Sequence, residues 1–391
     1  MKPKLAWLHP HFCYWTGGTK YILAVIRELT KDYQVTVYTE DYNPEVKKEF
    51  SKIKVKVIKI APLSTNRLIY WMILPFLIPV EFLRFRNLIK RNDYLISSMF
   101  PMNLLANMVN ARKHIQFIFE PFAFFYDKQM IEGYPPMIKF LMKAAKLFYG
   151  SIDIYTTGKS AKLMTVNRGV SVWIHKIYHR PSEPSYLIVD TNKFKSTLDK
   201  KLMGKYKDKK IVLHTTDYTP IKRSPFIIKY FKKVVEKVPN ALLLITTPRE
   251  VPASKIAHED LARKVGMGDN VEIVGYVSNA DLPNYYTLAD CAVYPGIGAG
   301  ASACSYFVLE VMACKTPVVR TSDSVEEVID GESGFLFRPS DAKGMVEGIV
   351  KLLKNKNLAR KMGEKARKRI LEIYTADRVV KNFNSVLKSV K

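Results

Sequence analysis

Cysteine is scarce in this chain, and the arrangement of the few cysteines excludes two classes of protein. The four cysteines among 391 residues form no C-x-x-C pair and have no framework spacing. Neither a structural zinc site nor a disulfide-stapled secreted domain is therefore indicated, and a reducing cytosol fits. The sequence also lacks low-complexity tracts and short-period repeats, which excludes solenoid and tail architectures.

Acidic residues are few relative to basic ones. The chain has 62 Lys and Arg against 36 Asp and Glu, a formal net charge of +26. This excess attracts polyanions: nucleic acid, anionic lipid or phosphorylated small molecules. We disfavour nucleic acid, because no reading-head motif is present and the aromatic residues cluster in apolar runs instead of among basic residues.

The sequence offers neither a signal peptide nor a clear membrane span. The apolar run at residues 5–8 is too short for a signal peptide, so we expect the mature protein to begin near residue 1. The most hydrophobic segment, residues 68–83, falls short of the ~20 apolar residues that span a bilayer. Pro75, Pro79 and Glu81 also interrupt it.

Two interpretations of residues 68–83 stay open. The segment can be a buried helix pair of the first domain. It can also be a surface element in which Trp71, Phe76 and Phe82 enter the lipid interface while the arginines that follow meet anionic headgroups. The second interpretation predicts a cytoplasmic protein associated peripherally with a membrane.

Apolar strands alternate with amphipathic helices along most of the chain, a pattern typical of parallel sheets covered on both faces. The length favours two domains. We expect an N-terminal Rossmann-like domain at 1–182, a second one at 183–372, and a C-terminal helix at 373–391 that packs back on the first. The expected strands of the first domain include residues 5–8, 34–38, 55–60, 94–97, 114–119 and 152–156; those of the second include 211–214, 241–246, 271–274, 291–294 and 317–320.

The chemistry concentrates in the second half. A strand at 291–294 is followed by a loop rich in small residues, 296–305, and by a helix at 306–313. Free backbone N–H groups and the helix dipole make such a junction an anion site, for which a diphosphate is the natural ligand. Glu310, about one turn into the helix, could accept hydrogen bonds from ribose hydroxyls.

This segment resembles the nucleotide-sugar site of the GT-B fold, family-four glycosyltransferases. Pro295, Glu310, 312–313 and 317–319 stand on the family's positions. Further similar stretches are the glycine loop Gly17-Gly18, the interdomain signature at 189–194, the base-binding strand at 271–277 and the phrase at 325–337. The resemblance spans nearly the whole chain and is most specific in the C-terminal half.

The resemblance implies a retaining, metal-independent hexosyltransferase without a resident cofactor. A UDP- or GDP-linked sugar would bind mainly to the C-terminal domain, and a lipid-linked or glycan acceptor to the N-terminal domain. Lys222 matches the family's phosphate-binding lysine, with Arg223 beside it. The expected donor-binding residues are Gly17, Gly18, Lys222, Arg223, Tyr276, Ser302, Cys304, Ser305 and Glu310.

The sequence departs from the family pattern at three places. Ser302 replaces the first of two glutamates, Asp217 stands near the family's arginine, and Phe119 stands near its histidine. Glu120 is then the candidate acid, base or acceptor-orienting residue, with Lys222 as the second catalytic candidate. His9 and His11 are alternatives for the role of Glu120.

These departures keep a second function open: a degenerate GT-B protein that binds a nucleotide sugar, glycan or partner enzyme without turnover. A sugar-nucleotide epimerase is disfavoured, because the interdomain and C-terminal signatures match the transferases more closely.

Overall fold

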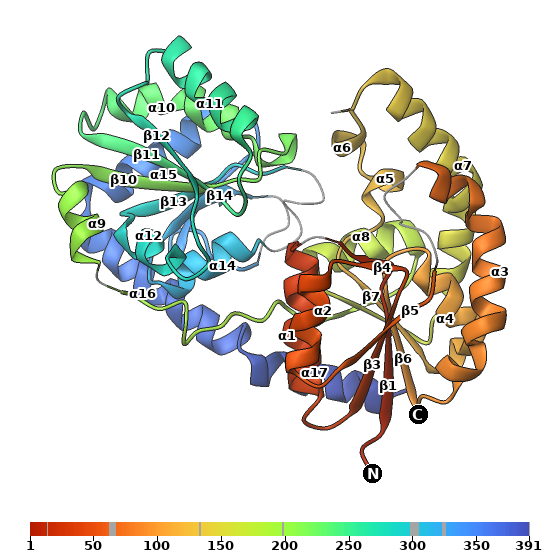
Figure 1. Cartoon of the computed structure of the whole chain (residues 1–391). Helices are drawn as coiled ribbons and strands as arrows, with labels where there is room; N and C mark the ends of the chain where they lie inside the picture. The colour runs from red at the N-terminus through yellow and green to blue at the C-terminus, as the bar shows by residue number, and fades with distance from the viewer. Residues whose placement is uncertain are drawn as a thin grey trace. The chain divides into compact units, whose positions relative to one another are not determined.

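The computed structural model describes residues 1–13, 15–61, 68–132, 134–197, 199–297, 305–322 and 326–390. The chain forms two compact units (Figure 1). The first comprises Met1–Ile188 with Ala376–Lys391, and the second comprises Val189–Thr375.

The first unit is built on a parallel sheet. Within the described residues its seven strands run in the order β5-β3-β1-β6-β7-β8-β9. They are β1 Lys4–Leu8, β3 Gln34–Thr39, β5 Lys56–Lys59, β6 Tyr94–Ser98, β7 His114–Ile118, β8 Lys162–Thr165 and β9 Glu183–Pro184, with β2 His11–Phe12 and β4 Asp41–Tyr42 as a separate pair. The helices are α1 Gly17–Leu29, α2 Pro44–Lys52, α3 Leu68–Lys90, α4 Met102–Asn110, α5 Ala123–Tyr126, α6 Lys128–Glu132, α7 Pro136–Lys159, α8 Arg168–Tyr178 and α17 Ala376–Lys388, with a 3-10 turn at Ala111–Lys113.

The second unit repeats this architecture. Its six described strands are parallel and run in the order β12-β11-β10-β13-β14-β15. They are β10 Lys210–Thr215, β11 Ala241–Thr247, β12 Val271–Tyr276, β13 Cys291–Tyr294, β14 Val318–Thr321 and β15 Gly334–Phe337. The helices are α9 Lys200–Lys205, α10 Ser224–Val235, α11 Pro252–Lys264, α12 Leu282–Leu288, α14 Tyr306–Ala313, α15 Ala342–Lys354 and α16 Lys356–Ile373, with a 3-10 turn at Pro220–Lys222. The expected pair of Rossmann-like, doubly wound α/β units is confirmed.

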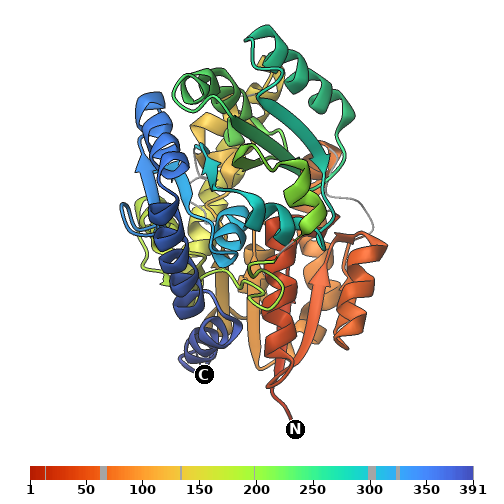
Figure 2. The same cartoon turned by 90° about the vertical axis from the view of Figure 1, so that its left-hand side faces the viewer.

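The C-terminal helix α17 belongs to the first unit. Phe383 on this helix lies with its ring centroid 6.0 Å from that of Trp7 and 5.8 Å from that of Phe117, both on central strands. Helix α17 also packs against α1. Figure 1 and Figure 2 both show the two ends of the chain at the same end of the first unit.

Two sequence expectations need correction. Residues 152–156 lie inside α7 and are not a strand; the strand follows at β8. The apolar alternation there arises because Ile152 and Ile154 are exposed while Asp153 is buried. The first segment of the first unit runs to Ile188, beyond the expected residue 182, because Glu183–Pro184 extends its sheet as β9.

The hydrophobic segment at 68–83 is part of one helix, α3, which contains Pro75 and Pro79. Trp71 does not lie free for lipid, because its ring packs among those of Phe100, Phe122, Phe125 and Tyr149. Phe82 packs partly against the core cluster around Ala6 and Leu95. Phe76 is 76% exposed. No described helix combines the length and apolar character needed to cross a bilayer.

A buried acid on α3 faces a second acid at the end of β3. Tyr70 donates its hydroxyl to Glu40 Oε1 at 2.7 Å, and Glu81 is 1% exposed with no hydrogen-bond partner among the described residues. Burial raises the pKa of Glu40 to about 8, against the hydrogen bond from Tyr70. Burial and the charge of Glu40 raise the pKa of Glu81 to about 9. Both carboxyls are therefore held in the neutral form at neutral pH.

This pair predicts a loss of stability at alkaline pH. The folded state binds more protons than the unfolded state between about pH 4.5 and pH 8 to 9, so the free energy of unfolding falls as pH rises through that window. Glu81→Gln should flatten the fall and stabilise the protein at pH 8 by roughly 2 kcal/mol or more. Urea unfolding at pH 5 and pH 8 measures the effect. The exposed Glu236→Gln is the control, and parallel pH profiles of wild type and Glu81→Gln would contradict the prediction.

Candidate functional site

The strand order of the second unit creates a switch point at β10. From β10 the chain moves to β11 and β12 on one side and then returns to β13 on the other. The connections after β10 and β13 therefore leave the same sheet edge in opposite directions, which is where open α/β sheets bind ligands. The backbone N–H of Ile297 donates to the carbonyl of Ile221 at 3.0 Å and joins the two connections.

A buried histidine fixes the start of this region. His214 on β10 has its Nδ1 3.1 Å from the carbonyl oxygen of Val293, so Nδ1 carries the proton and donates. Its Nε2 lies 3.0 Å from Ser224 Oγ, which lies 2.8 Å from Thr216 Oγ1. Burial lowers the pKa of His214 to about 4, so the ring is neutral and ties β10, β13 and the start of α10 together.

Lys222 lies in the connection after β10, beside the end of β13. Its ammonium donates to the Tyr294 hydroxyl at 3.2 Å and lies 5.3 Å from the ring centroid. The guanidinium carbon of Arg320 lies 5.4 Å from the same centroid. Arg320, however, forms an ion pair with Glu327 in which neither side chain is exposed, so its charge is already offset.

Asp217, which stands near the family's arginine, has a structural role in this loop. Its Oδ1 accepts from the backbone N–H of Thr219 at 3.0 Å and from the Thr219 hydroxyl at 2.6 Å. Burial alone would raise the pKa of Asp217, but the charge of Lys222 and the bonds from Thr219 hold it below its usual value. Asp217 is thus an ionised brace of the loop that carries Lys222.

Arg223 is turned to the protein itself. Its Nη1 donates to the carbonyl of Pro339, and its guanidinium carbon lies 3.9 Å from the ring centroid of Phe226. The residue has a positive φ of 53° at the start of α10. The structure therefore gives Arg223 an anchoring role, and its expected donor contact stays a prediction.

Helix α14 begins where the connection after β13 ends. Ser305 is its N-cap residue, and Glu310 lies in its second turn with an exposure of 6%. The hydroxyl of Tyr286 on α12 donates to Glu310 Oε2 at 3.2 Å. Ser302 and Cys304, two of the expected donor-binding residues, lie outside the described residues.

Tyr276 lies at the carboxyl end of the edge strand β12 and is 51% exposed. Because the strands are parallel, it lies on the same sheet edge as the connections after β10 and β13. Two further strands separate it from β13, so its base contact stays a prediction.

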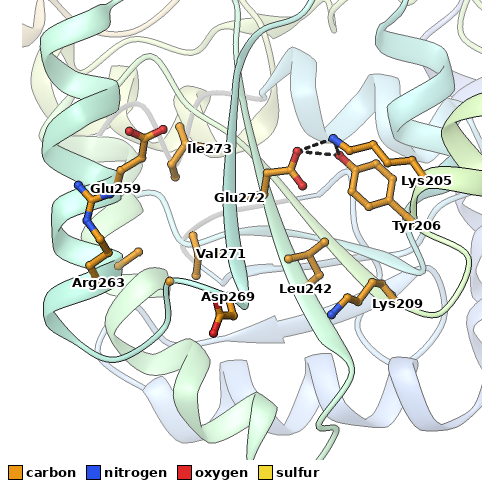
Figure 3. Close-up of a pocket in the computed structure, with 12 residues that line it drawn as sticks. Lys205, Tyr206, Lys209, Leu242, Glu259, Arg263, Asp269, Val271, Glu272 and Ile273 are labelled. Atoms are coloured by element: carbon orange, nitrogen blue, oxygen red, sulfur yellow. Dashed lines mark hydrogen bonds and ion pairs between the residues drawn. The ribbon is translucent and has the colours of Figure 1, made fainter.

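A hollow lies at the other edge of this sheet, where strands β11 and β12 begin (Figure 3). Its lining includes Leu242 and Val271, which stand near the amino ends of β11 and β12. Glu272 points toward Lys205 and Tyr206, accepting from their side chains at 2.7 and 2.9 Å. The hollow is therefore distinct from the switch point, and Glu272 in its lining is already paired with Lys205 and Tyr206.

In the first unit, the connections after β1 and β7 approach each other. Thr16 caps α1 by accepting from the N–H of Thr19 at 3.1 Å, and Gly17 and Gly18 are the first helical residues. A Cβ placed on Gly18 would lie 3.7 Å from the ring of Phe119, which is ordinary contact. Glu120, which follows Phe119 in the sequence, is half-buried, and its acceptor contact stays a prediction.

The position expected near the family's histidine holds an aromatic cluster. The ring of Phe119 lies 5.0 Å from that of Phe117 and 5.5 Å from that of Tyr21. His9 is buried with Nδ1 3.0 Å from Ser98 Oγ, and burial together with His11 lowers its pKa to about 3. Burial also lowers the pKa of His11, against the charge of Asp41. His9 therefore stays neutral at neutral pH.

Sequence reasoning missed Tyr294 and the bracing role of Asp217. Tyr294 was assigned only as the last residue of a strand, although a tyrosine at the carboxyl end of a central strand is placed to meet the switch-point loops. Asp217 gave no signal, because its partners depend on the folding of the loop around Thr219.

Comparison with known proteins places the second unit in a family context. Residues 195–369 match the family described as Glycosyl transferases group 1. N-acetyl-alpha-D-glucosaminyl L-malate synthase of Bacillus anthracis is 27% identical over 194 residues, which cover 48% of this chain and 47% of that protein. The chain thus spans about half the length of the curated relatives it matches.

Solved structures share the fold over the whole chain. A glycosyltransferase from Rickettsia africae ESF-5 has a TM-score of 0.76 and 18% identity, covering 100% of this chain and 98% of its own. Anabaena HepE in complex with UDP and glucose has a TM-score of 0.75 and 12% identity, covering 99% and 100%. At these identities the likeness shows the GT-B fold alone.

The geometry predicts that Lys222 governs anion binding at the switch point. Lys222→Met should weaken binding of inorganic pyrophosphate roughly tenfold, the effect of losing one hydrogen bond to a charged group. Lys229→Met, which removes an exposed lysine of the following helix α10, should leave binding unchanged. Titration calorimetry at low salt measures both, and equal losses in the two variants would contradict a specific site.

Proposed function

We propose that this chain transfers a hexosyl unit from a nucleotide diphosphate sugar to an acceptor, because residues 195–369 match the family described as Glycosyl transferases group 1. One observation carries the proposal: the connections after β10 and β13, joined by the Ile297–Ile221 hydrogen bond, bring Lys222 to the switch point that precedes α14. The structure of the same fold that holds UDP and glucose supports a nucleotide sugar as donor.

The donor diphosphate would bind between Lys222 and the start of α14. Lys222 brings a cation whose hydroxyl partner, Tyr294, is rigidly held at the end of a buried strand. The N–H groups at the start of α14 add a positive dipole end. Charge develops on the diphosphate as the glycosyl bond breaks, and these preorganised groups would stabilise it without a metal ion.

Glu310 would orient the ribose from the second turn of α14. The hydrogen bond from Tyr286 fixes the carboxylate, which supports a positioning role for this residue. Tyr276, on the same sheet edge, is proposed to contact the base.

The acceptor would bind to the first unit, near Gly17, Gly18 and Glu120. Glu120 is proposed to orient the acceptor hydroxyl or to take its proton, and the family's retention of anomeric configuration is proposed for the transfer. The acceptor class we propose is a lipid-linked sugar or glycan presented at a membrane surface, in keeping with the net charge of +26.

A ligand and turnover screen tests the proposal. A ligand that binds the folded state raises the melting temperature by mass action. UDP or GDP, but not both equally, should raise it, and slow hydrolysis of the matching sugar should follow. Lys222→Met should lose the shift, Glu310→Gln should reduce it, and Lys229→Met should keep it.

The outcomes separate the two candidate functions. Binding that depends on Lys222, without hydrolysis or transfer to any lipid-linked or glycan acceptor, would contradict the transferase. It would favour the degenerate alternative, which Ser302 in place of a glutamate motivates. No shift with any nucleotide would contradict both.

A further inference from the structure

Helix α7 of the first unit buries polar residues and exposes apolar ones, the reverse of an ordinary surface helix. Its buried residues are Gly150, Asp153, Thr156 and Thr157, without a single large apolar side chain. Asp153 accepts from Asn103 at 3.2 Å and from Tyr178 at 2.8 Å, so the polar face is satisfied inside the protein. A helix of a water-soluble domain normally does the opposite and turns its apolar stripe to the core.

The apolar residues of α7 face outward. Leu147 is 78% exposed, Phe148 71% and Phe140 69%. The exposed apolar set of α7 is Met137, Ile138, Phe140, Leu141, Leu147, Phe148, Ile152, Ile154 and Tyr155. Met137, Leu141, Phe148 and Tyr155 recur at helical spacing, so they form one continuous stripe. Contiguous exposed apolar surface of this kind marks an interaction site.

Helix α3 contacts α7 and carries a second stripe. The Tyr149 hydroxyl donates to the carbonyl of Trp71, and the two rings lie 6.0 Å apart. On α3 the exposed apolar residues Met72, Phe76, Val80 and Leu83 again follow helical spacing. Figure 1 shows α3 and α7 as neighbouring long helices of the first unit.

The exposed charged residues of α3 and α7 are all basic. Each helix contains one acidic residue, Glu81 on α3 and Asp153 on α7, and both are buried. The basic residues are Arg84, Arg86 and Lys90 on α3 and Lys139, Lys143, Lys146 and Lys159 on α7, none of them buried. The exposed faces are therefore apolar and cationic, without a carboxylate.

Exposed faces that are both apolar and cationic indicate which kind of partner they bind. Protein interfaces are depleted of lysine at their cores, whereas helices that lie in a membrane interface combine an apolar face with flanking lysines and arginines. Lysine stems can extend along the apolar face and place their ammonium groups among headgroup phosphates. The geometry that fits an apolar face with flanking cations is a helix lying in the interface plane.

We propose that the exposed faces of α7 and α3 form a surface that inserts into the interface of an anionic lipid bilayer, with α7 as the main contact. This deepens the membrane-surface part of the proposed function, and on that basis the surface would bring the first unit to lipid-linked acceptors.

Flotation of the full-length protein with vesicles tests the surface. The protein should float with vesicles of phosphatidylcholine and phosphatidylglycerol in equal parts, and much less with phosphatidylcholine alone. The triple variant Phe140→Gln, Leu147→Gln, Phe148→Gln should lower the partition coefficient by roughly tenfold or more, since each side chain loses its apolar burial in the interface. The triple variant Lys139→Gln, Lys143→Gln, Lys146→Gln should lose the preference for the anionic vesicles.

A matched variant controls for general hydrophobicity. Met203→Gln, Ile256→Gln, Leu371→Gln removes three exposed apolar side chains of the second unit and should float like wild type. Equal flotation of the α7 apolar variant and wild type would overturn the proposal, as would a wild type that ignores anionic vesicles. If the wild-type protein forms an oligomer and the α7 apolar variant is a monomer, the proposal is overturned in favour of a protein interface.

The result is separable from the transferase itself. Vesicle binding needs no nucleotide sugar, and the α7 variants should keep the nucleotide-dependent rise in melting temperature. Loss of that rise together with flotation would mean misfolding, which circular dichroism checks; a folded variant that loses the rise would overturn the separate role of α7.

Discussion

The candidate site of the second unit depends on the parallel pairing of β10 with β13. This pairing is short, joining Val212 to Cys291 and Leu213 to Ala292. His214 extends it with a hydrogen bond to the carbonyl of Val293, in a ring that burial keeps neutral. The strand order changes side at this pair. The connection that carries Lys222 and the helix that carries Glu310 therefore approach the same sheet edge from opposite sides. Without the pairing, Lys222 and the start of α14 would not lie on one sheet edge, where we propose that the diphosphate binds.

The sequence predicted the second unit well, because its signals are local. Strands such as Ala241–Thr247 are buried on both faces and read as continuous apolar runs, and the loop before Tyr306 is rich in small residues. The same pattern pointed to Glu310 and the family resemblance pointed to Lys222, and the donor contacts of both residues stay predictions. The brace formed by Asp217 could not be predicted, since a carboxylate near the position of the family's arginine looks like a reversal of charge until Thr219 folds back onto it.

The first unit was less predictable, because α7 breaks the usual relation between apolarity and burial. The alternation Ile152-Asp-Ile154 satisfies the period of a strand, yet the isoleucines face outward and the aspartate faces inward. The boundary between the units failed for a different reason. Glu183–Pro184 is a two-residue strand with a linker-like composition, and only its pairing with Met164 and Thr165 assigns it to the first sheet.

The burial of acidic residues in α3 and α7 underlies both the predicted loss of stability at alkaline pH and the proposed membrane-binding surface. In α3 and α7 the fold places Glu81 and Asp153 inside, and burial raises the pKa of Asp153 to about 6 against the hydrogen bonds from Tyr178, Tyr126 and Asn103. The outer faces keep only cations, whose field in physiological salt reaches about one Debye length, ~8 Å. Such charges act only once the surface is near the headgroups, so the apolar stripes must supply the contact that persists. In the proposed binding, charge would select which bilayer is approached, whereas the exposed phenylalanine and leucine side chains would determine how strongly the first unit stays there.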